Sequence, residues 1–331
     1  MTVPLCKVGD LWFPDGNLLI RVGDRVCRVY QGFLASQSPV MGDMFSFPQP
    51  SEGADMVEGV PAVRLPDPPE EVTHWLRAML LPWTFPGYPN YTEIDQLLAV
   101  LRLSHKYDVQ YLRRRALEHF AALLPVDVDN VKANAHHFKS RNISHECPLS
   151  VYLRINSIAH EVGALWLIPC IIYELHQFMY DDPCALDNIS TESPPLTTQL
   201  LIRLYKISHL ITQQFCLAHL VRHVADCGQR QPCGAERRVT RSDWDEELHK
   251  DPVCFYSGLD EIAEDGKSVA CLGRGFEDTQ NLCYSCRLDM RARHLHACKI
   301  FWNALPKSLG LPMWKDLLAT KASDLGDDMK T

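Results

Sequence analysis

Long apolar runs are absent from this sequence. The longest, ALWLIPCII at residues 164–172, is far shorter than the roughly 20 apolar residues that a membrane-spanning helix requires. The opening residues, MTVPLCKVGDLWFPDG, carry neither the basic nor the apolar segment of a secretion signal. We therefore expect a protein that neither enters a membrane nor is exported, and that resides in the cytoplasm, the nucleus or both.

Basic residues are fewer than acidic ones as well. Asp and Glu number 41 against 33 Lys and Arg, which gives a formal net charge of −8 and a pI near 5.9. A basic face is what normally attracts a protein to a phosphate backbone, so nucleic acid is not an expected partner. Hydrophobic residues, at 46%, are typical of a folded chain, and 331 residues are enough for more than one domain.

Complete catalytic motifs are missing too. A GKS tripeptide at 266–268 lacks the first glycine of a phosphate-binding loop, because residue 261 is glutamate. Two His-Glu pairs are followed by Leu149 and Ala164, where a zinc protease has its second histidine. The motifs G-x-S-x-G and G-x-G-x-x-G do not occur. We predict that the protein is not an enzyme, and a metal-dependent enzyme ranks last among the alternatives.

An interrupted amphipathic pattern lies at residues 33–45, FLASQSPVMGDMF. Pro39 has no amide hydrogen to donate, and it biases Ser38 away from helical geometry. The pattern therefore predicts two short helices that meet at a Ser-Pro corner.

The neighbouring segments predict further elements in a definite order. The run NLLIRVGDRVCRVY predicts a hairpin that turns at Gly23-Asp24, and AVRLPD predicts one more strand. PPEEVTHWLRAML predicts a helix, and a second broken helix pair is expected to bend near Tyr107-Asp108. The apolar stripes expected on these helices are Val72, Trp75, Leu76 and Met79, then Ile94, Leu97, Leu98 and Leu101, then Val109, Leu112, Ala116 and Phe120.

Hairpin, helix pair, strand, helix and helix pair in this order resemble the BTB/POZ fold. The likeness is carried by FLASQSPVMGDMF and by LLAVLRLSHKYDVQYLRRRALEHF. INSIAHEVGALWLIPCIIYELHQF and IFWNALPKSLGLPMWKDL resemble the helical region and closing helix of BTB proteins from mushroom-forming fungi. The resemblance implies an α+β, mostly helical fold. We expect a BTB/POZ domain at 10–124, a helical region at 125–225, a small cysteine-bearing region with a closing helix at 226–320, and a flexible tail at 321–331.

The chain departs from the family near the first helix of the pair. A histidine and a basic residue usually stand there, whereas this chain has Tyr30 and Gln31. Some BTB dimers bind co-repressor peptides in a charged groove built from that basic residue and an acidic residue of the first strand. Asp10 matches the acidic position but lacks its usual partner, which weakens the expectation of such a groove.

BTB domains are interaction modules, so the resemblance implies a dimerising adaptor or scaffold. Leu11, Trp12 and Phe13 are large for a solvent-facing segment, and we expect them in a homodimer interface. Met56 and Glu58 fit a loose hydrophobic-x-Glu element that cullin-binding relatives use, which would make the protein a substrate adaptor of a cullin-type ubiquitin ligase. The alternative is a transcriptional co-regulator or scaffold without a ligase role.

Thirteen cysteines, an odd number without a secretion signal, indicate reduced thiols. Cys227 and Cys233 bracket one short loop, and Cys283 and Cys286 form a C-x-x-C pair. Two such pairs can aim four thiolates at one structural zinc ion. The other interpretation is that these cysteines are small buried core residues. Cys298 fits that second interpretation, and His294, one turn before it, leaves a mixed ligand set open.

Overall fold

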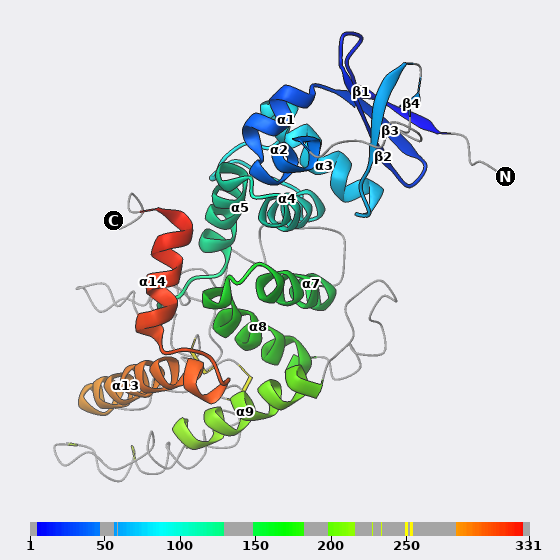
Figure 1. Cartoon of the computed structure of the whole chain (residues 1–331). Helices are drawn as coiled ribbons and strands as arrows, with labels where there is room; N and C mark the ends of the chain where they lie inside the picture. The colour runs from blue at the N-terminus through cyan, green and yellow to red at the C-terminus, as the bar shows by residue number, and fades with distance from the viewer. Residues whose placement is uncertain are drawn as a thin grey trace. The chain divides into compact units, whose positions relative to one another are not determined.

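The computed structural model describes residues 5–46, 56–57, 59–128, 148–181, 198–215, 227, 233, 249–250, 252–253 and 283–326 (Figure 1). The chain forms two compact units. The N-terminal unit comprises Met1–Phe120, His160–Gly163 and Ala322–Thr331, and the C-terminal unit comprises Ala121–Ala159 and Ala164–Lys321. The described residues are mostly helical with a small sheet, which confirms the predicted α+β class. Within these ranges, no helix has both the length and the apolar character to cross a membrane.

The sheet of the N-terminal unit is built around the predicted hairpin. Its strands are β1 (Cys6–Trp12), β2 (Leu18–Val22), β3 (Arg25–Val29), β4 (Met56–Val57) and β5 (Val60–Arg64), in the spatial order β1-β3-β2-β5-β4. β2 and β3 pair antiparallel through a turn at Gly23, whose φ of 55° is favourable for glycine. β5 then pairs parallel with β2, and β1 pairs parallel with β3. The hairpin prediction is confirmed.

The predicted helix break at Ser38 is also confirmed. Helix α1 (Gln31–Gln37) ends at Ser38, whose φ of −134° and ψ of 109° are extended, and α2 (Pro39–Ser46) follows at once. The Ser38 hydroxyl oxygen accepts a hydrogen bond from the Met41 amide at 3.1 Å, which caps the start of α2. Leu34 and Met41 are fully buried, so each short helix contributes one anchor to the core.

Three longer helices complete the N-terminal unit: α3 (Pro69–Leu80), α4 (Ile94–Lys106) and α5 (Gln110–Leu123). The apolar stripes predicted for them are buried at every named position. The bend between α4 and α5 occurs at Asp108, which has a φ of 53°, a left-handed conformation that Asp tolerates better than most residues. The second broken helix pair is therefore confirmed.

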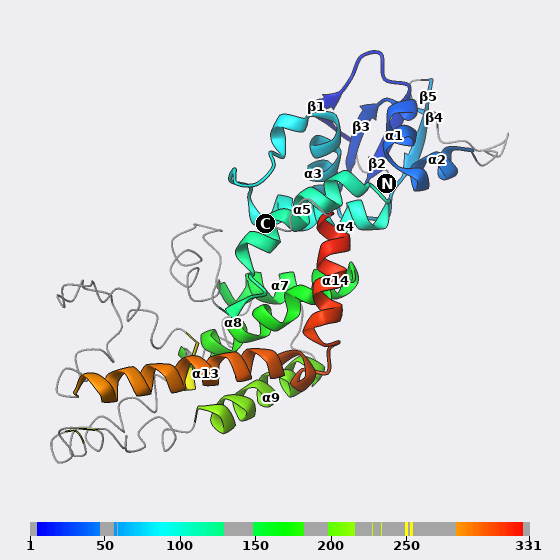
Figure 2. The same cartoon turned by 90° about the vertical axis from the view of Figure 1, so that its left-hand side faces the viewer.

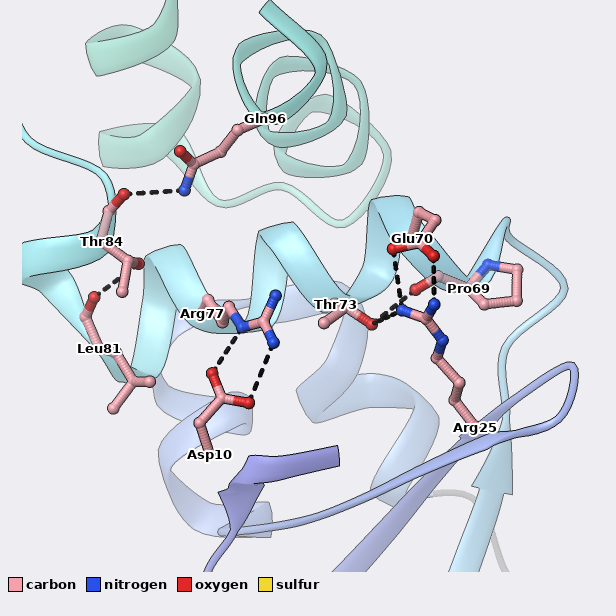
Figure 3. A network of polar contacts seen from close by, with 9 residues as sticks. All are labelled: Asp10, Arg25, Pro69, Glu70, Thr73, Arg77, Leu81, Thr84 and Gln96. Atoms are coloured by element: carbon pink, nitrogen blue, oxygen red, sulfur yellow. Dashed lines mark hydrogen bonds and ion pairs between the residues drawn. The ribbon is translucent and has the colours of Figure 1, made fainter. Parts of the chain in front are cut away.

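Helix α3 is tied to the sheet by two ion pairs (Figure 3). Arg77 donates to both carboxylate oxygens of Asp10, at 2.6 and 3.1 Å. Nearer the start of the helix, Arg25 pairs with Glu70 and lies 3.4 Å from the Thr73 hydroxyl. These contacts fix which side of α3 faces strands β1 and β3.

The C-terminal unit is helical in its described parts. Its helices include α7 (Pro148–Glu161), α8 (Ile168–Asp181), α9 (Thr198–Gln214) and α13 (Tyr284–Ser308), and α9 lies alongside α13 in both views (Figures 1 and 2). Aromatic rings form its core, because Tyr173 contacts Phe301 and Trp302 with ring centroids 6.0 and 5.8 Å apart. The Trp302 indole N–H donates to the Val126 carbonyl at 2.8 Å, so this large side chain is buried without losing a hydrogen bond.

The predicted flexible tail at 321–331 is wrong for its first part. Helix α14 (Trp314–Leu325) continues through this stretch, and Leu325 is buried. Asp324 forms an ion pair with Arg113 of α5 at 2.8 Å, in a site where both side chains are largely buried. The polar composition hid these two anchors, since a single leucine and a single acid suffice to hold the last turn. Residues 327–331 lie outside the described part.

Candidate metal centre

Four cysteines converge in the C-terminal unit. The sulfur atoms of Cys227, Cys233, Cys283 and Cys286 all lie within 4.8 Å of one another, and all four are free thiols. The sulfur atoms of Cys227 and Cys283 are 3.7 Å apart. A tetrahedral zinc ion with bonds of about 2.3 Å to sulfur places its ligands about 3.8 Å from each other. The cluster therefore has the dimensions of a four-thiolate metal site.

The C-x-x-C pair owes its position to the start of α13. Cys283 is the residue that precedes the first turn, with an extended φ of −64° and ψ of 158°, and Cys286 lies in that turn. The amide of Cys283 donates to the sulfur of Cys233 at 3.3 Å, which joins the two pairs directly. Cys227, Cys233 and Cys286 are buried, whereas Cys283 is half-buried.

The start of α13 also favours a charged sulfur. The main-chain N–H of Cys286 donates to the Cys283 sulfur, and this hydrogen bond lowers the pKa of the Cys283 thiol to about 7. Burial raises the pKa of the Cys233 thiol, and a bound cation would favour its ionised form. Four sulfur atoms with one group already prone to ionise suit a borderline-soft divalent ion.

His294 and Cys298 do not join this cluster. They form a separate buried pair on α13, with the imidazole Nε2 and the sulfur 3.2 Å apart. The Cys298 thiol also lies 3.7 Å from the Pro252 carbonyl, and the His294 ring packs 5.8 Å from that of Phe215. Among the described residues, the group that could hold a metal consists of the four cysteines alone. Cys298 is thus a core residue, as one of the two interpretations predicted.

The three residues expected in a homodimer interface, Leu11, Trp12 and Phe13, differ in how deeply they are buried. Leu11 is fully buried within the chain, which corrects the expectation that it is available to a partner, because it is the one position of β1 that packs into the core while the residues before it are exposed or half-buried. Trp12 and Phe13 are half-buried, under the Lys7 ammonium at 4.1 Å and beside the Tyr30 ring at 5.1 Å.

The proposed cullin-binding element is described only in part. Met56 belongs to the short strand β4, which pairs antiparallel with β5. Glu58 lies outside the described residues. The expectation that this element binds a cullin therefore stays a prediction.

The acidic residue of the expected peptide groove has a partner that sequence reasoning missed. Asp10 is engaged by Arg77 from α3, and this hydrogen bond lowers the pKa of the Asp10 carboxyl (Figure 3). Tyr30 donates its hydroxyl to Asp15 at 2.7 Å. Arg77 lies 67 positions from Asp10 in the sequence. Its place on the polar side of α3 was the one sequence signal that could have suggested this pairing.

An exposed aromatic loop, residues 82–92, was also missed as a candidate surface. Trp83 is 75% exposed and Tyr91 is 65% exposed. The loop is nevertheless held in place: the Gln96 amide donates to the Thr84 carbonyl at 2.9 Å (Figure 3), and Arg115 donates to the Phe85 carbonyl at 3.0 Å. The cluster of aromatic and proline residues between two predicted helices was the sequence signal that could have identified this loop as a candidate surface.

Comparison with known proteins identifies no relative of this chain. No protein-family model, curated protein or solved structure matches the chain. The order of elements in the N-terminal unit and the four-cysteine cluster in the C-terminal unit are therefore the observations from which a function can be inferred.

Proposed function

We propose that this chain is a protein-interaction module, a dimerising adaptor or scaffold of the BTB/POZ type, whose C-terminal unit is stabilised by a structural zinc ion. The observation that carries the zinc site in this proposal is the convergence of four cysteine sulfur atoms within 4.8 Å. Four thiolates complete a tetrahedral shell and leave no position for a substrate or water, which is the pattern of a structural rather than a catalytic zinc site. The protein acts by contact and carries no catalytic activity of its own.

Metal analysis of the purified full-length protein tests the zinc site. We expect about one zinc per chain, because one tetrahedral ion uses all four sulfur atoms. Cys286→Ser should lose the metal, since it removes a buried ligand. Cys6→Ser is the matched control, because Cys6 is exposed and lies outside the cluster, and it should keep the metal. Wild-type protein without zinc would end this part of the proposal.

The helix pair of the N-terminal unit supports the interaction role. Leu34 and Met41 anchor the pair in the core, while Phe33 and Val40 remain exposed at 39% and 40%. Exposed apolar side chains on a firmly anchored helix pair are typical of a contact surface. We place a homodimer interface there, together with the half-buried Trp12 and Phe13.

Analytical ultracentrifugation measures the oligomeric state of the protein directly. The wild-type protein should sediment as a dimer at micromolar concentration, and Phe33→Ser combined with Val40→Ser should shift it to a monomer without unfolding it, because both side chains are already exposed. Leu201→Ser with Ile202→Ser on α9, which removes two comparably exposed apolar side chains elsewhere, should leave the dimer intact. A wild-type monomer would rule out the dimeric form of the proposal.

Affinity purification of the tagged protein distinguishes the ligase adaptor from the scaffold. Recovery of a cullin that is lost on Glu58→Ala would assign the adaptor role and the hydrophobic-x-Glu element. Recovery of the protein itself with nuclear or signalling proteins, and no cullin, would assign the co-regulator or scaffold role in the cytoplasm or nucleus.

A further inference from the structure

Within the cysteine cluster, the sulfur atoms of Cys227 and Cys283 are close together, and Cys283 is accessible to solvent. Cys227 and Cys283 lie 3.7 Å apart, and they are 56 residues apart in the sequence. Cys283 is the half-buried member of the cluster, whereas its three neighbours are buried. A small molecule in the solvent therefore meets the sulfur of Cys283 first.

Accessibility distinguishes Cys283 from the other cysteines of this unit. All four ligands of a four-cysteine zinc site are thiolates, so the one that the solvent reaches is the one that an oxidant meets. Cys283 precedes the first turn of α13 and is half-buried. Cys170 and Cys298, by contrast, are buried and offer no such access.

We infer that Cys283 and Cys227 form an oxidative modification site, at which a hydroperoxide converts their two thiolates to a disulfide and so releases the zinc ion. This inference rests on the proposed zinc site. It assigns to the same four residues a regulated as well as a structural role.

The chemistry balances with hydrogen peroxide as the oxidant. The Cys283 thiolate attacks one peroxide oxygen, the O–O bond breaks, and with one proton the products are Cys283 sulfenic acid and water. The Cys227 thiolate then attacks the sulfenic sulfur, the S–O bond breaks, and the leaving hydroxide takes a second proton to become water. Two sulfur atoms are oxidised, one peroxide is reduced, and two thiolates, Cys233 and Cys286, remain.

Two remaining ligands do not hold a zinc ion that four had bound, so disulfide formation and zinc release are one event. The two sulfur atoms, 3.7 Å apart in the cluster, approach to about 2.05 Å when the disulfide forms. A thiol reductant reverses the step, because exchange returns both cysteines to thiolates that can bind zinc again.

The test treats zinc-loaded full-length protein with hydrogen peroxide. A chromogenic chelator follows the zinc that is released, and mass spectrometry of digested, thiol-blocked samples identifies the disulfide. We expect one zinc released for each Cys227–Cys283 disulfide formed, and recovery of the zinc-bound protein after dithiothreitol and added zinc. Cys6→Ser should release zinc at the wild-type rate, because the exposed Cys6 plays no part in the cluster.

Each result supports or overturns the inference. Zinc retention at a peroxide dose that already oxidises Cys6 overturns it while leaving the structural zinc site intact. Zinc release with a different disulfide, or with sulfinic acid in place of a disulfide, also overturns the assignment of this pair. A purified protein that binds no zinc at all fails the proposed function first, and the redox inference with it.

Discussion

The hydroxyl of Ser38 donates a hydrogen bond to the main-chain carbonyl of Tyr107, 69 residues further along the chain. Ser38 is the break between α1 and α2, and Tyr107 begins the bend between α4 and α5. The two broken helix pairs of the N-terminal unit are thus joined at their corners. Because the same hydroxyl accepts the Met41 amide, one buried side chain satisfies main-chain groups of both pairs.

Ser38→Ala should destabilise the N-terminal unit by about 2 kcal/mol, because it leaves a buried carbonyl and a buried amide without their partner. Equilibrium urea unfolding at neutral pH measures this as a lower midpoint. Ser36→Ala is the control: its hydroxyl also donates to a main-chain carbonyl, that of Phe33, but it is exposed to water, and the change should cost less than about 0.5 kcal/mol. Equal effects of the two substitutions would contradict the structural role of the Ser38 corner.

The two breaks were predictable because their causes are local. Proline at 39 interrupts a helix whatever surrounds it, and the apolar stripes of α3, α4 and α5 show a helical period along the sequence itself. The bond between Ser38 and Tyr107, and the pairing of Asp10 with Arg77, were not predictable. They depend on how distant elements pack, which no local pattern records.

The metal centre was half predictable for the same reason. Spacing within each cysteine pair indicated that two thiolates could face one ion, but only the folded chain shows that Cys233 meets the amide of Cys283. Likewise, Leu11 was expected in an interface because the segment around it was taken to face solvent, whereas its burial depends on which elements pack against the strand.

The end of α14 should matter to the stability of the N-terminal unit. Asp324→Asn removes the charge that balances the largely buried Arg113 guanidinium, and we expect a loss of about 2 kcal/mol. Asp316→Asn, an exposed acid on the same helix, should cost less than about 1 kcal/mol. Thermal unfolding compares the stability of the two variants with that of the wild type. An Asp324→Asn protein as stable as the wild type would show that the ion pair contributes nothing to stability.

The C-terminal unit should become less stable in mild acid because of His176. Burial lowers the pKa of its imidazole from 6.5 to about 4, and its Nε2 lies 3.0 Å from the Ser208 hydroxyl. The unfolded chain therefore takes up a proton below pH 6.5 that the folded chain refuses until about pH 4. Stability is fully present above pH 6.5 and falls as the pH drops toward 4, by as much as about 3 kcal/mol.

Urea unfolding of wild type and His176→Gln across this pH range isolates the effect. The difference in free energy of unfolding between the wild type and His176→Gln should shrink or reverse as the pH falls from 6.5 to 4, because glutamine takes up no proton. His209→Gln on the exposed side of α9 serves as the control and should follow the wild-type curve. Parallel curves for wild type and His176→Gln would mean that His176 is not the group responsible.

X-ray absorption at the zinc edge of the purified full-length protein tests the central claim most directly. A site made of Cys227, Cys233, Cys283 and Cys286 predicts a first shell of four sulfur atoms at about 2.3 Å and no nitrogen or oxygen ligand. Loss of the signal in Cys283→Ser, with its retention in Cys298→Ala, would place the ion at this cluster and not at the neighbouring buried pair. A shell that contains oxygen or histidine nitrogen, or protein that carries no zinc, would contradict the account.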